Sequence, residues 1–361
     1  MYNGSSWVNE GLLIESEART NLLLNSVPLI GTNWSLEGSP TFQSSAETDP
    51  TGNTDAQSVV ATQVARSGLR TGVNGGVVSG TVYTISVIAK DIGQGALQIL
   101  GGFTGFNFAF QNFDLANGTL GSGDGTSTGQ IEGLGNGWYR CSLTATATGS
   151  ATDQIFIIAV PSPTSTGNTS ATIGDGFLIW AAQAEAAPTP SSYIPTSGAT
   201  VTRAAESVVL DAADMPFSAT GYSLRQTYRQ PYWDVSGCRT ATRVLTTGGV
   251  NSGSFLLQNR AGYLTEANCT SAIDGFKASN VSQDGPNYSL ASRMSSSEIQ
   301  LAANGTSDST PATITSGVGE AVSDVRPLFA EFGTLNYPMT AKQVVAWAND
   351  IGTTGIEEAT Q

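Results

Sequence analysis

Short stretches of alternating residues, separated by turn dipeptides, are the feature that most limits the folds open to this chain. Residues 82–89 alternate, with one face formed by Tyr83, Ile85, Val87 and Ala89. Residues 106–110 repeat the alternation with Phe106, Phe108 and Phe110, and Asn117-Gly118 then reads as a hairpin turn. A side-chain period of two is that of a strand with one buried face, so these stretches predict β-strands.

Further strand signals follow the same arrangement. Asn136-Gly137 is a second turn pair, and Tyr139, Cys141 and Leu143 share one face of the stretch after it. Residues 155–160 and 177–183 are apolar on both faces, which predicts strands buried between two sheets. Turn signals at such intervals predict a β-sandwich or jelly roll.

A change of composition divides the chain. Residues 184–203 contain three prolines and no helical period, which indicates a linker or an extended closing segment. A second strand-rich part follows, with alternation in 222–230 and in 298–306, where Asn304-Gly305 reads as a turn. Residues 340–350 predict a helix, with Thr340 as N-cap and an apolar stripe of Val344, Val345, Trp347 and Ala348. The expected fold class is all-β: two β-sandwich (jelly-roll) domains in tandem, with one short C-terminal helix.

Charge and hydropathy exclude several classes of partner. Charged residues make up 12% of the chain and hydrophobic residues 39%, enough apolar area for folded cores. The net charge of −14 argues against nucleic acid, because phosphates require Lys and Arg. The sequence contains no apolar run of about 20 residues, so no membrane insertion is expected. The first residues lack the basic and apolar regions of a secretory signal.

The chain has no histidine, which removes Ser-His-Asp and Cys-His mechanisms and the usual transition-metal ligand. Its three cysteines are too few and too irregularly spaced for a disulfide framework or a zinc site. Cys238 and Cys269 could pair, although buried free thiols are the favoured interpretation. Asp114 and Asp124 in the glycine-rich residues 114–129 raise a calcium alternative, but an EF-hand spacing is missing and a solvated hairpin is favoured. No cofactor and no metal are expected.

Carboxylates are the remaining hydrolytic groups, since a glycosidase needs two of them held about 5 to 10 Å apart. The second half contains Glu266, Asp274, Asp284, Glu298 and Glu331. None of these lies in an ExDxxE-type pattern, which would place an acid and a nucleophile on one strand face. Isolated surface carboxylates are the favoured interpretation, and no enzymatic activity is expected.

Residues 225–243 contain four of the chain's 15 basic residues, interleaved with aromatic residues. Sugars are recognised by flat aromatic faces and planar polar side chains, and Arg also attracts uronate or sulfate. The candidate glycan-binding residues are therefore Tyr228, Arg229, Tyr232, Trp233 and Arg239. The alternative, an outward Arg ladder beside ordinary core aromatics, stays open. Core positions are expected for Trp34, Trp138, Trp180 and Tyr193.

Three stretches resemble, in order, a domain common in tailed-phage and prophage virion proteins. They are GLLIESEARTNLLLNS (11–26, with Trp34 soon after), GNGWYRCSLTATAT (135–148) and SYIPTSGATVTRAAE (192–206, preceded by FLIWAAQAE). That domain is similar to carbohydrate-binding-module jelly rolls. SEIQLAANGTSDS and FAEFGTLNYPMTAKQVVAWAN resemble parts of a concanavalin A-like lectin/glucanase sandwich. The resemblance implies a docking segment at 1–20, a jelly roll at 21–206 and a lectin/glucanase-like sandwich at 207–361.

The function implied is that of a non-enzymatic structural and adhesive virion protein, a fibre, spike or decoration that contacts host surface polysaccharide. Such a protein would be assembled in the host cytoplasm, exposed on the particle surface, and bound as a homotrimer to capsid or tail proteins. A purely architectural subunit is the alternative, and a polysaccharide hydrolase a distant third.

The start of the chain is the expected docking element, through Trp7, Leu12, Leu13 and Ile14, because only ten residues precede the motif and leave no room for an upstream module. Alternatively, Glu15, Glu17 and Arg19 are the solvent face of an edge strand, which they guard against aggregation.

Overall fold

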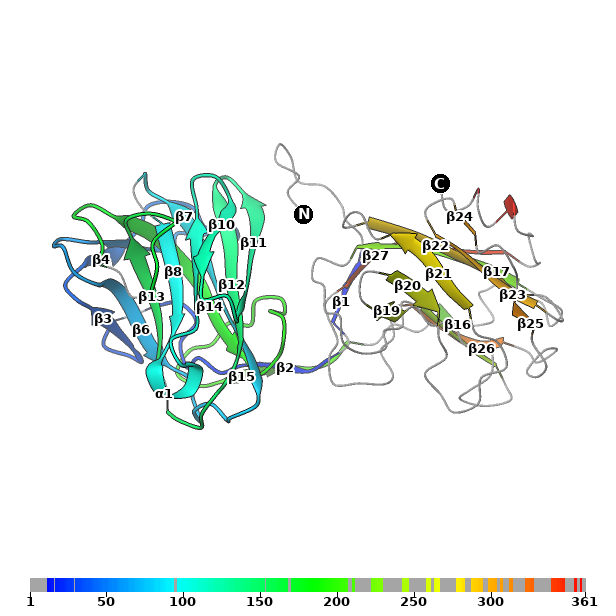
Figure 1. Cartoon of the computed structure of the whole chain (residues 1–361), viewed down its shortest axis with the longest axis horizontal. Helices are drawn as coiled ribbons and strands as arrows, with labels where there is room; N and C mark the ends of the chain where they lie inside the picture. The colour runs from blue at the N-terminus through cyan, green and yellow to red at the C-terminus, as the bar shows by residue number, and fades with distance from the viewer. Residues whose placement is uncertain are drawn as a thin grey trace. The chain divides into compact units, whose positions relative to one another are not determined.

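The computed structural model describes most of the first 206 residues and, beyond them, mainly strands. The described residues are 12–15, 17–28, 30–93, 96–152, 154–167, 170–206, 210–211, 222–229, 242–246, 258–260, 263–266, 277–282, 287–294, 298–303, 306–307, 312–313, 322–327, 339–347, 354–355 and 358. The chain divides into two compact units; of the described residues, 19–204 belong to the first, and 12–15 and 17–18 belong to the second together with those after Ala204. Along the described residues, the first unit is therefore an insertion within the sequence of the second (Figure 1).

The first unit is a sandwich of two antiparallel six-stranded sheets. Sheet I has the order β10-β9-β8-β13-β6-β3, with bounds Thr119–Gly123, Phe110–Asp114, Ala96–Gly101, Gln154–Val160, Ser67–Gly72 and Trp34–Glu37. Sheet II has the order β11-β12-β7-β14-β5-β4, with bounds Thr128–Gly135, Trp138–Thr146, Val82–Asp91, Gly176–Glu185, Gln57–Val60 and Thr41–Ser44. The single-turn helix α1 (Phe103–Phe106) connects β8 to β9, and β2 (Arg19–Asn21) pairs with β15 (Val201–Arg203).

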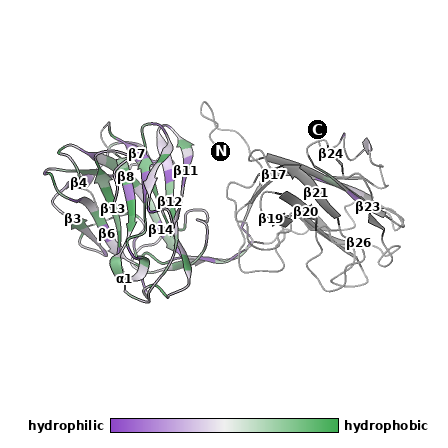
Figure 2. Ribbon diagram, in the orientation of Figure 1, coloured by the Kyte–Doolittle hydropathy of each residue, from purple (hydrophilic) through white to green (hydrophobic). Residues whose placement is uncertain are grey.

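The core lies between these two sheets, and the predicted alternation of β7 is confirmed. Its inward face consists of Tyr83, Ile85, Val87 and Ala89, all in the main hydrophobic cluster. On β12, Cys141 and Leu143 lie in the same cluster and Tyr139 packs against it, again as predicted. Figure 2 shows hydrophobic and hydrophilic residues interleaved along the strands of this unit.

The strands predicted to be buried on both faces are β13 and β14, and both are. Ile155 and Ile157 of β13 face the main core, whereas Phe156, Ile158 and Val160 form a second cluster with Ala96, Leu100 and Phe110 on the outer face of sheet I. On the outer face of sheet II, β14 contributes Leu178 and Trp180 to a cluster with Trp138.

The expected core tryptophans are confirmed, with exposed fractions of 1% for Trp34, 2% for Trp138 and 6% for Trp180. Tyr193 is half-buried, and its ring centroid lies 5.0 Å from that of Trp180.

The turns are those that the sequence predicted, but one predicted strand is wrong. Asn136 and Gly137, with φ of 52° and 78°, join β11 to β12 as a two-residue turn of the kind that matches strand twist. Gly118 is the last residue of the turn that joins β9 to β10. Residues 106–110 do not form a strand, because α1 ends at Phe106 and both Asn107 and Phe108 have positive φ. Alternation in the sequence carries no sign of that reversal.

The proline-containing stretch is a closing segment (residues 186–200) fastened to β14 by buried polar groups. β14 has a bulge between Trp180 and Gln183, where its pairing with β7 shifts register. The Asn21 amide fills this position: its Nδ2 donates to the carbonyls of Ala182 (3.3 Å) and Ile194 (2.9 Å). Its Oδ1 accepts from the backbone N–H groups of Leu23 (3.1 Å) and Ala184 (3.2 Å).

A second fastening involves Glu185, which is 1% exposed. Its carboxylate accepts hydrogen bonds from the Ser191 N–H (2.9 Å), the Ser191 hydroxyl (2.6 Å) and the Gln183 amide (2.6 Å). Because buried polar groups must be hydrogen-bonded, these contacts hold residues 191 to 194 against the sheet.

The second unit is also built from strands. Its largest sheet has the order β1-β27-β17-β22-β23-β24, with β25 also paired to β23; the bounds are Leu12–Ile14, Met339–Trp347, Tyr222–Arg229, Asn287–Met294, Glu298–Ala303, Thr306–Ser307 and Ala312–Thr313. A three-stranded sheet contains β16 (Leu210–Asp211), β26 (Val322–Pro327) and β18 (Thr242–Thr246). Another contains β19 (Gln258–Arg260), β20 (Tyr263–Glu266) and β21 (Lys277–Ser282).

The predicted all-β class is confirmed, but the C-terminal helix is wrong. Residues 339–347 form β27, which pairs with β1 on one side and β17 on the other. Val344 and Val345 are β-branched and favour a strand. Their pairing with β17 shows that this stretch is a strand rather than a helix. The predicted hairpin at Asn304-Gly305 agrees with the pairing of Ala303 opposite Thr306 in β23 and β24. No helix among the described residues has the length and apolarity needed to cross a bilayer.

Candidate functional site

The glycan site predicted from the sequence lies largely outside the described residues. Tyr228 and Arg229 end β17, where they pair with Tyr288 and Asn287 of β22. Tyr232, Trp233 and Arg239 fall outside the described part of the chain. This site stays a prediction.

The predicted docking residues are divided in the same way. Leu12, Leu13 and Ile14 form β1, which adds to the edge of the second unit's large sheet opposite Met339 to Ala341 of β27. Trp7 lies outside the described residues, and the docking role stays a prediction. Glu15 is buried rather than part of a solvent-facing charged edge, and its backbone exchanges hydrogen bonds with Glu206. Arg19 is buried as well, so the solvent-face alternative is wrong for both residues.

The cysteines and the candidate carboxylates of the second half offer no described site. Cys141 is a buried free thiol, as predicted, and burial raises its pKa well above the ordinary value. Cys238 and Cys269 lie outside the described residues, as do Asp274, Asp284 and Glu331. Glu266 ends β20 and Glu298 begins β23. Within the described part of the chain, no three His, Cys, Asp or Glu side chains gather as they would around a metal ion.

Asp114 and Asp124, the calcium alternative of the sequence, both serve as turn acceptors. Asp114 accepts from the backbone of Ala116 and from the backbone and amide of Asn117. Asp124 accepts from the backbone and hydroxyl groups of Thr126 and Ser127. Burial alone would raise the pKa of Asp124, but these hydrogen bonds outweigh it and lower the pKa below its usual value.

The lowered pKa of Asp124 predicts a pH-dependent contribution to stability. A carboxyl whose pKa is depressed by folding stabilises the fold fully above its unfolded-state pKa, and this contribution is lost as the pH falls through the folded-state value. We therefore expect the free energy of unfolding of an Asp124→Asn variant to fall less steeply than that of the wild type from about pH 5 to about pH 3. Equal slopes in denaturant titrations at several pH values would contradict this.

The outer face of sheet I carries the candidate functional site, a group of side chains that we call the arginine cluster: Glu37, Arg66, Arg70 and Phe156. Strand register places one row of residues across this face, in the order Phe110, Leu100, Phe156, Arg70 and Ser35. Glu37 follows two residues after Ser35 on the edge strand β3, and Arg66 immediately precedes β6. Three separate parts of the sequence thus supply one surface.

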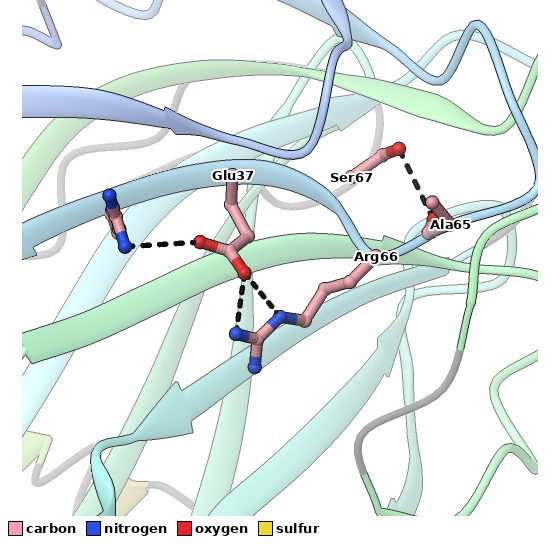
Figure 3. A network of polar contacts seen from close by, with 5 residues as sticks. Glu37, Ala65, Arg66 and Ser67 are labelled. Atoms are coloured by element: carbon pink, nitrogen blue, oxygen red, sulfur yellow. Dashed lines mark hydrogen bonds and ion pairs between the residues drawn. The ribbon is translucent and has the colours of Figure 1, made fainter.

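One carboxylate organises both arginines. Oε1 of Glu37 accepts from Nε (2.6 Å) and lies 2.5 Å from Nη2 of Arg66, as Figure 3 shows. Its Oε2 is 3.6 Å from Nη1 of Arg70, an ion-pair distance rather than a hydrogen bond. The guanidinium of Arg66 also lies over the Phe156 ring, with Cζ 4.6 Å from the centroid. This stacking fixes the plane of the guanidinium.

Arg70 is the most exposed charged side chain of the cluster. The Arg70 side chain is 42% exposed, that of Arg66 27% and that of Glu37 14%. Nε of Arg70 is buried and has no hydrogen-bond partner. A ligand cannot reach this buried Nε, but it can reach the exposed part of the Arg70 guanidinium, whose Nη1 lies only at ion-pair distance from Glu37 and beside the oriented Arg66. Such an arrangement can hold hydroxyl and carboxylate groups by hydrogen bonds and charge.

Sequence reasoning did not single out these residues. Residues 1–207 contain only six basic residues, and Arg66 and Arg70 are two of them, four positions apart. That spacing puts both on one face of an extended chain and was the available signal. Their meeting with Glu37 and Phe156 depends on strand order, which no short motif shows.

Neither the protein-family models nor the curated proteins include a match to the sequence. The N-terminal CBM22-1–CBM22-2 tandem domain of Paenibacillus barcinonensis Xyn10C is 9% identical, with a TM-score of 0.31, over 96% of this chain and 100% of that one. Domains LG4-5 of the mouse laminin alpha1 chain are 10% identical, with a TM-score of 0.26, over 97% of this chain and 95% of that one. Likenesses this weak do not indicate what the chain binds.

Proposed function

We propose that this protein is a non-enzymatic adhesive protein that binds glycans on the outer face of sheet I. The observation that carries the proposal is the arginine cluster, in which Arg66 is fixed by Glu37 and Phe156 while the Arg70 side chain is exposed and lies only at ion-pair distance from Glu37. Its rigid sheet support favours recognition, because donors that are already oriented lose little entropy when a ligand binds. The absence of histidine from the sequence agrees with binding rather than catalysis.

The charge of the cluster points to an acidic saccharide. Residues 1–207 carry 6 basic and 15 acidic residues, a net charge of −9, so the field of this part of the chain repels anions. Two arginines beside one glutamate make a local basic excess on that background. The planar fork of an Arg matches the two oxygens of a carboxylate or sulfate. Uronate-containing or sulfated polysaccharides are the ligand class that fits.

The setting we propose is the surface of a phage or phage-like particle. The support for it is the ordered resemblance of residues 11–26, 135–148 and 192–206 to a virion domain. Capsid or tail proteins and sister copies would then be the partners, with the start of the chain as the docking element. An architectural subunit that binds only such neighbours is the rival function, and glycan binding distinguishes the two.

The test is binding of the full-length protein to immobilised alginate, a polyuronate, with its Arg70→Ala variant alongside. We expect the variant to bind about tenfold more weakly, since hydrogen bonds to charged groups contribute about 1.5–3 kcal/mol. Wild-type binding should also weaken between about 50 mM and about 500 mM salt, because the ion pair between an alginate carboxylate and Arg70 would be exposed to solvent. Arg70→Lys should recover only part of the affinity, because Lys keeps the charge and loses the fork.

Lys90→Ala is the matched control, because it also removes one positive charge but from β7 in sheet II, where Lys90 pairs with Glu47. We expect its affinity for alginate to equal that of the wild type. Equal losses in Arg70→Ala and Lys90→Ala would reduce the effect to net charge. Undiminished binding by Arg70→Ala, or no binding by the wild type, would favour the architectural function.

A further inference from the structure

Among the described residues of the first unit, the most exposed aromatic rings are two phenylalanines between β8 and β9. Phe103 is 67% exposed and Phe108 45% exposed. Their ring centroids are 5.0 Å apart with an interplanar angle of 43°. We call this pair the aromatic tip. Two neighbouring exposed rings form a small apolar patch, which is a candidate surface for a ligand.

The backbone that carries the tip is strained. Asn107 has φ 48° and ψ 41°, and Phe108 follows with φ 61°, both in the left-handed region. A bulky side chain rarely adopts that conformation, and such outliers gather at functional sites. Burial of the Phe108 ring does not account for the strain, since nearly half of its surface remains exposed.

The tip is also firmly anchored. Phe106, which lies between Phe103 and Phe108 in the sequence, is 3% exposed. Its ring packs edge-on against Tyr83, with centroids 5.8 Å apart. The Gly105 carbonyl accepts from the backbone N–H of Thr148 at 2.8 Å. The N–H of Ala109 donates to Phe106 at 3.0 Å and that of Phe108 donates to Gly102 at 3.3 Å. A loop held in this way presents its rings in advance of binding, which reduces the entropy lost on association.

The loops that lie beside the tip are poor in charged residues. Loop 101–109 contacts loop 147–152 through Gly105, and loop 147–152 contacts loop 73–81 through the hydrogen bond from the Ser79 hydroxyl to the Thr148 carbonyl (3.2 Å). Residues 101–109, 147–152 and 73–81 contain no Asp, Glu, Lys or Arg, in a chain that has 44 of them, and Asp153, directly before β13, is the one charged residue in the three connections. They offer hydroxyl groups, the Asn107 amide and backbone groups instead. An uncharged, hydroxyl-bearing ligand fits this chemistry.

The exposed area of the aromatic tip indicates whether its ligand is a protein surface or a sugar ring. Given a full side-chain area near 200 Å² for Phe, the two rings expose about 200 Å² together. A stable protein interface buries about 800 Å² on each partner, several times more. The exposed area corresponds to one or two sugar rings. We infer that the aromatic tip is a stacking site for an uncharged saccharide. It is separate from the arginine cluster, and its binding does not depend on charge, whereas binding at the arginine cluster does.

The experiment measures retention of the full-length protein on immobilised neutral polysaccharides: dextran, mannan, amylose and xylan. We expect retention on at least one of them, unchanged between about 50 mM and about 500 mM salt because no ion pair is involved. Phe103→Ala and Phe108→Ala should each weaken it about tenfold, and Phe103→Leu nearly as much, since Leu keeps the apolar area but not the ring. Arg70→Ala should leave it unchanged, so this site and the arginine cluster can fail independently.

Two further variants keep the test decisive. Ile173→Ala truncates another apolar side chain of the first unit, 61% exposed, and should retain full binding. Phe108→Gly removes the ring and relieves the left-handed strain, so it should lose binding while its melting temperature stays equal or rises. Failure of the wild type to bind any of the four polysaccharides, or full binding by Phe103→Ala, would overturn the inference.

Discussion

An Asn21→Leu variant is expected to be less stable than the wild type by about 3–5 kcal/mol, because it leaves several buried backbone groups without partners. The Asn21 side chain is fully buried and makes all four of its hydrogen bonds with the main chain. One of these serves Ala182 inside the bulge of β14, where pairing with β7 is interrupted, and another serves Ala184 just after the bulge. Leucine has as many non-hydrogen side-chain atoms as asparagine and is no smaller, so the variant leaves no cavity and the loss comes from the missing hydrogen bonds.

Hydrogen exchange on the full-length protein locates the effect. Peptides that contain residues 177–185 should exchange much faster in Asn21→Leu than in the wild type, together with peptides of the closing segment near Ile194. Thr20→Val is the control, because the neighbouring Thr20 hydroxyl bonds to Thr202 in an exposed position (2.8 Å). We expect it to change stability by no more than about 0.5 kcal/mol. Similar exchange in both variants would show that the Asn21 amide is dispensable.

Gly68→Ala is expected to destabilise the first unit by about 3 kcal/mol or more, because one methyl group has no room between β6 and β13. A Cβ at Gly68 would lie 2.2 Å from the Ile157 carbonyl oxygen and 2.6 Å from the Ile158 Cα, both backbone atoms that cannot turn away. The two strands would have to separate. Since Arg70 and Phe156 face each other across these strands, binding to alginate should also fall.

Gly72 in the same strand provides the comparison. A Cβ there would have no heavy atom within 4 Å, and the residue is exposed. Gly72→Ala should leave the unfolding transition in denaturant within about 0.5 kcal/mol of the wild type or raise it slightly, since Gly loses more backbone entropy than Ala on folding. If the two Gly→Ala variants unfold alike, the close approach of β6 and β13 does not limit this position.

Local patterns in the sequence predicted those strands whose faces differ in polarity. Tyr83 to Ala89 alternate cleanly, and every predicted inward residue lies in the core. The same reasoning failed at Phe106 to Phe110, because a strand and a reversed loop can share one alternating pattern and only the positive φ of Asn107 and Phe108 separates them. It failed again at Met339 to Trp347, where Val344, Val345 and Trp347 satisfy both a helical stripe and a strand.

The candidate site was harder to predict than the fold. A search for clustered Arg and aromatic residues selects positions that are close in sequence, such as 225–243. Arg66 and Glu37 are 29 residues apart, and Phe156 is far from both. The order of β3, β6 and β13 in sheet I brings them together, and that order is a long-range property. Asn21 was overlooked for the related reason that its partners at 182, 184 and 194 belong to a strand more than 150 residues away and the segment that follows it.

The pairing of Leu12 with Ala341 ties the second unit to the order in which the chain is synthesised. The β1 strand leaves the ribosome before the first unit is made, and its partner β27 follows about 325 residues later in the chain. The first unit can close in the interval, since its entering strand β2 and leaving strand β15 pair with each other. Pairings between distant parts of a chain form slowly, and an unpaired edge is open to association with other chains meanwhile. Ribosome-bound chains that stop before Met339 should therefore contain a folded first unit and a β1 strand that is not yet paired with β27.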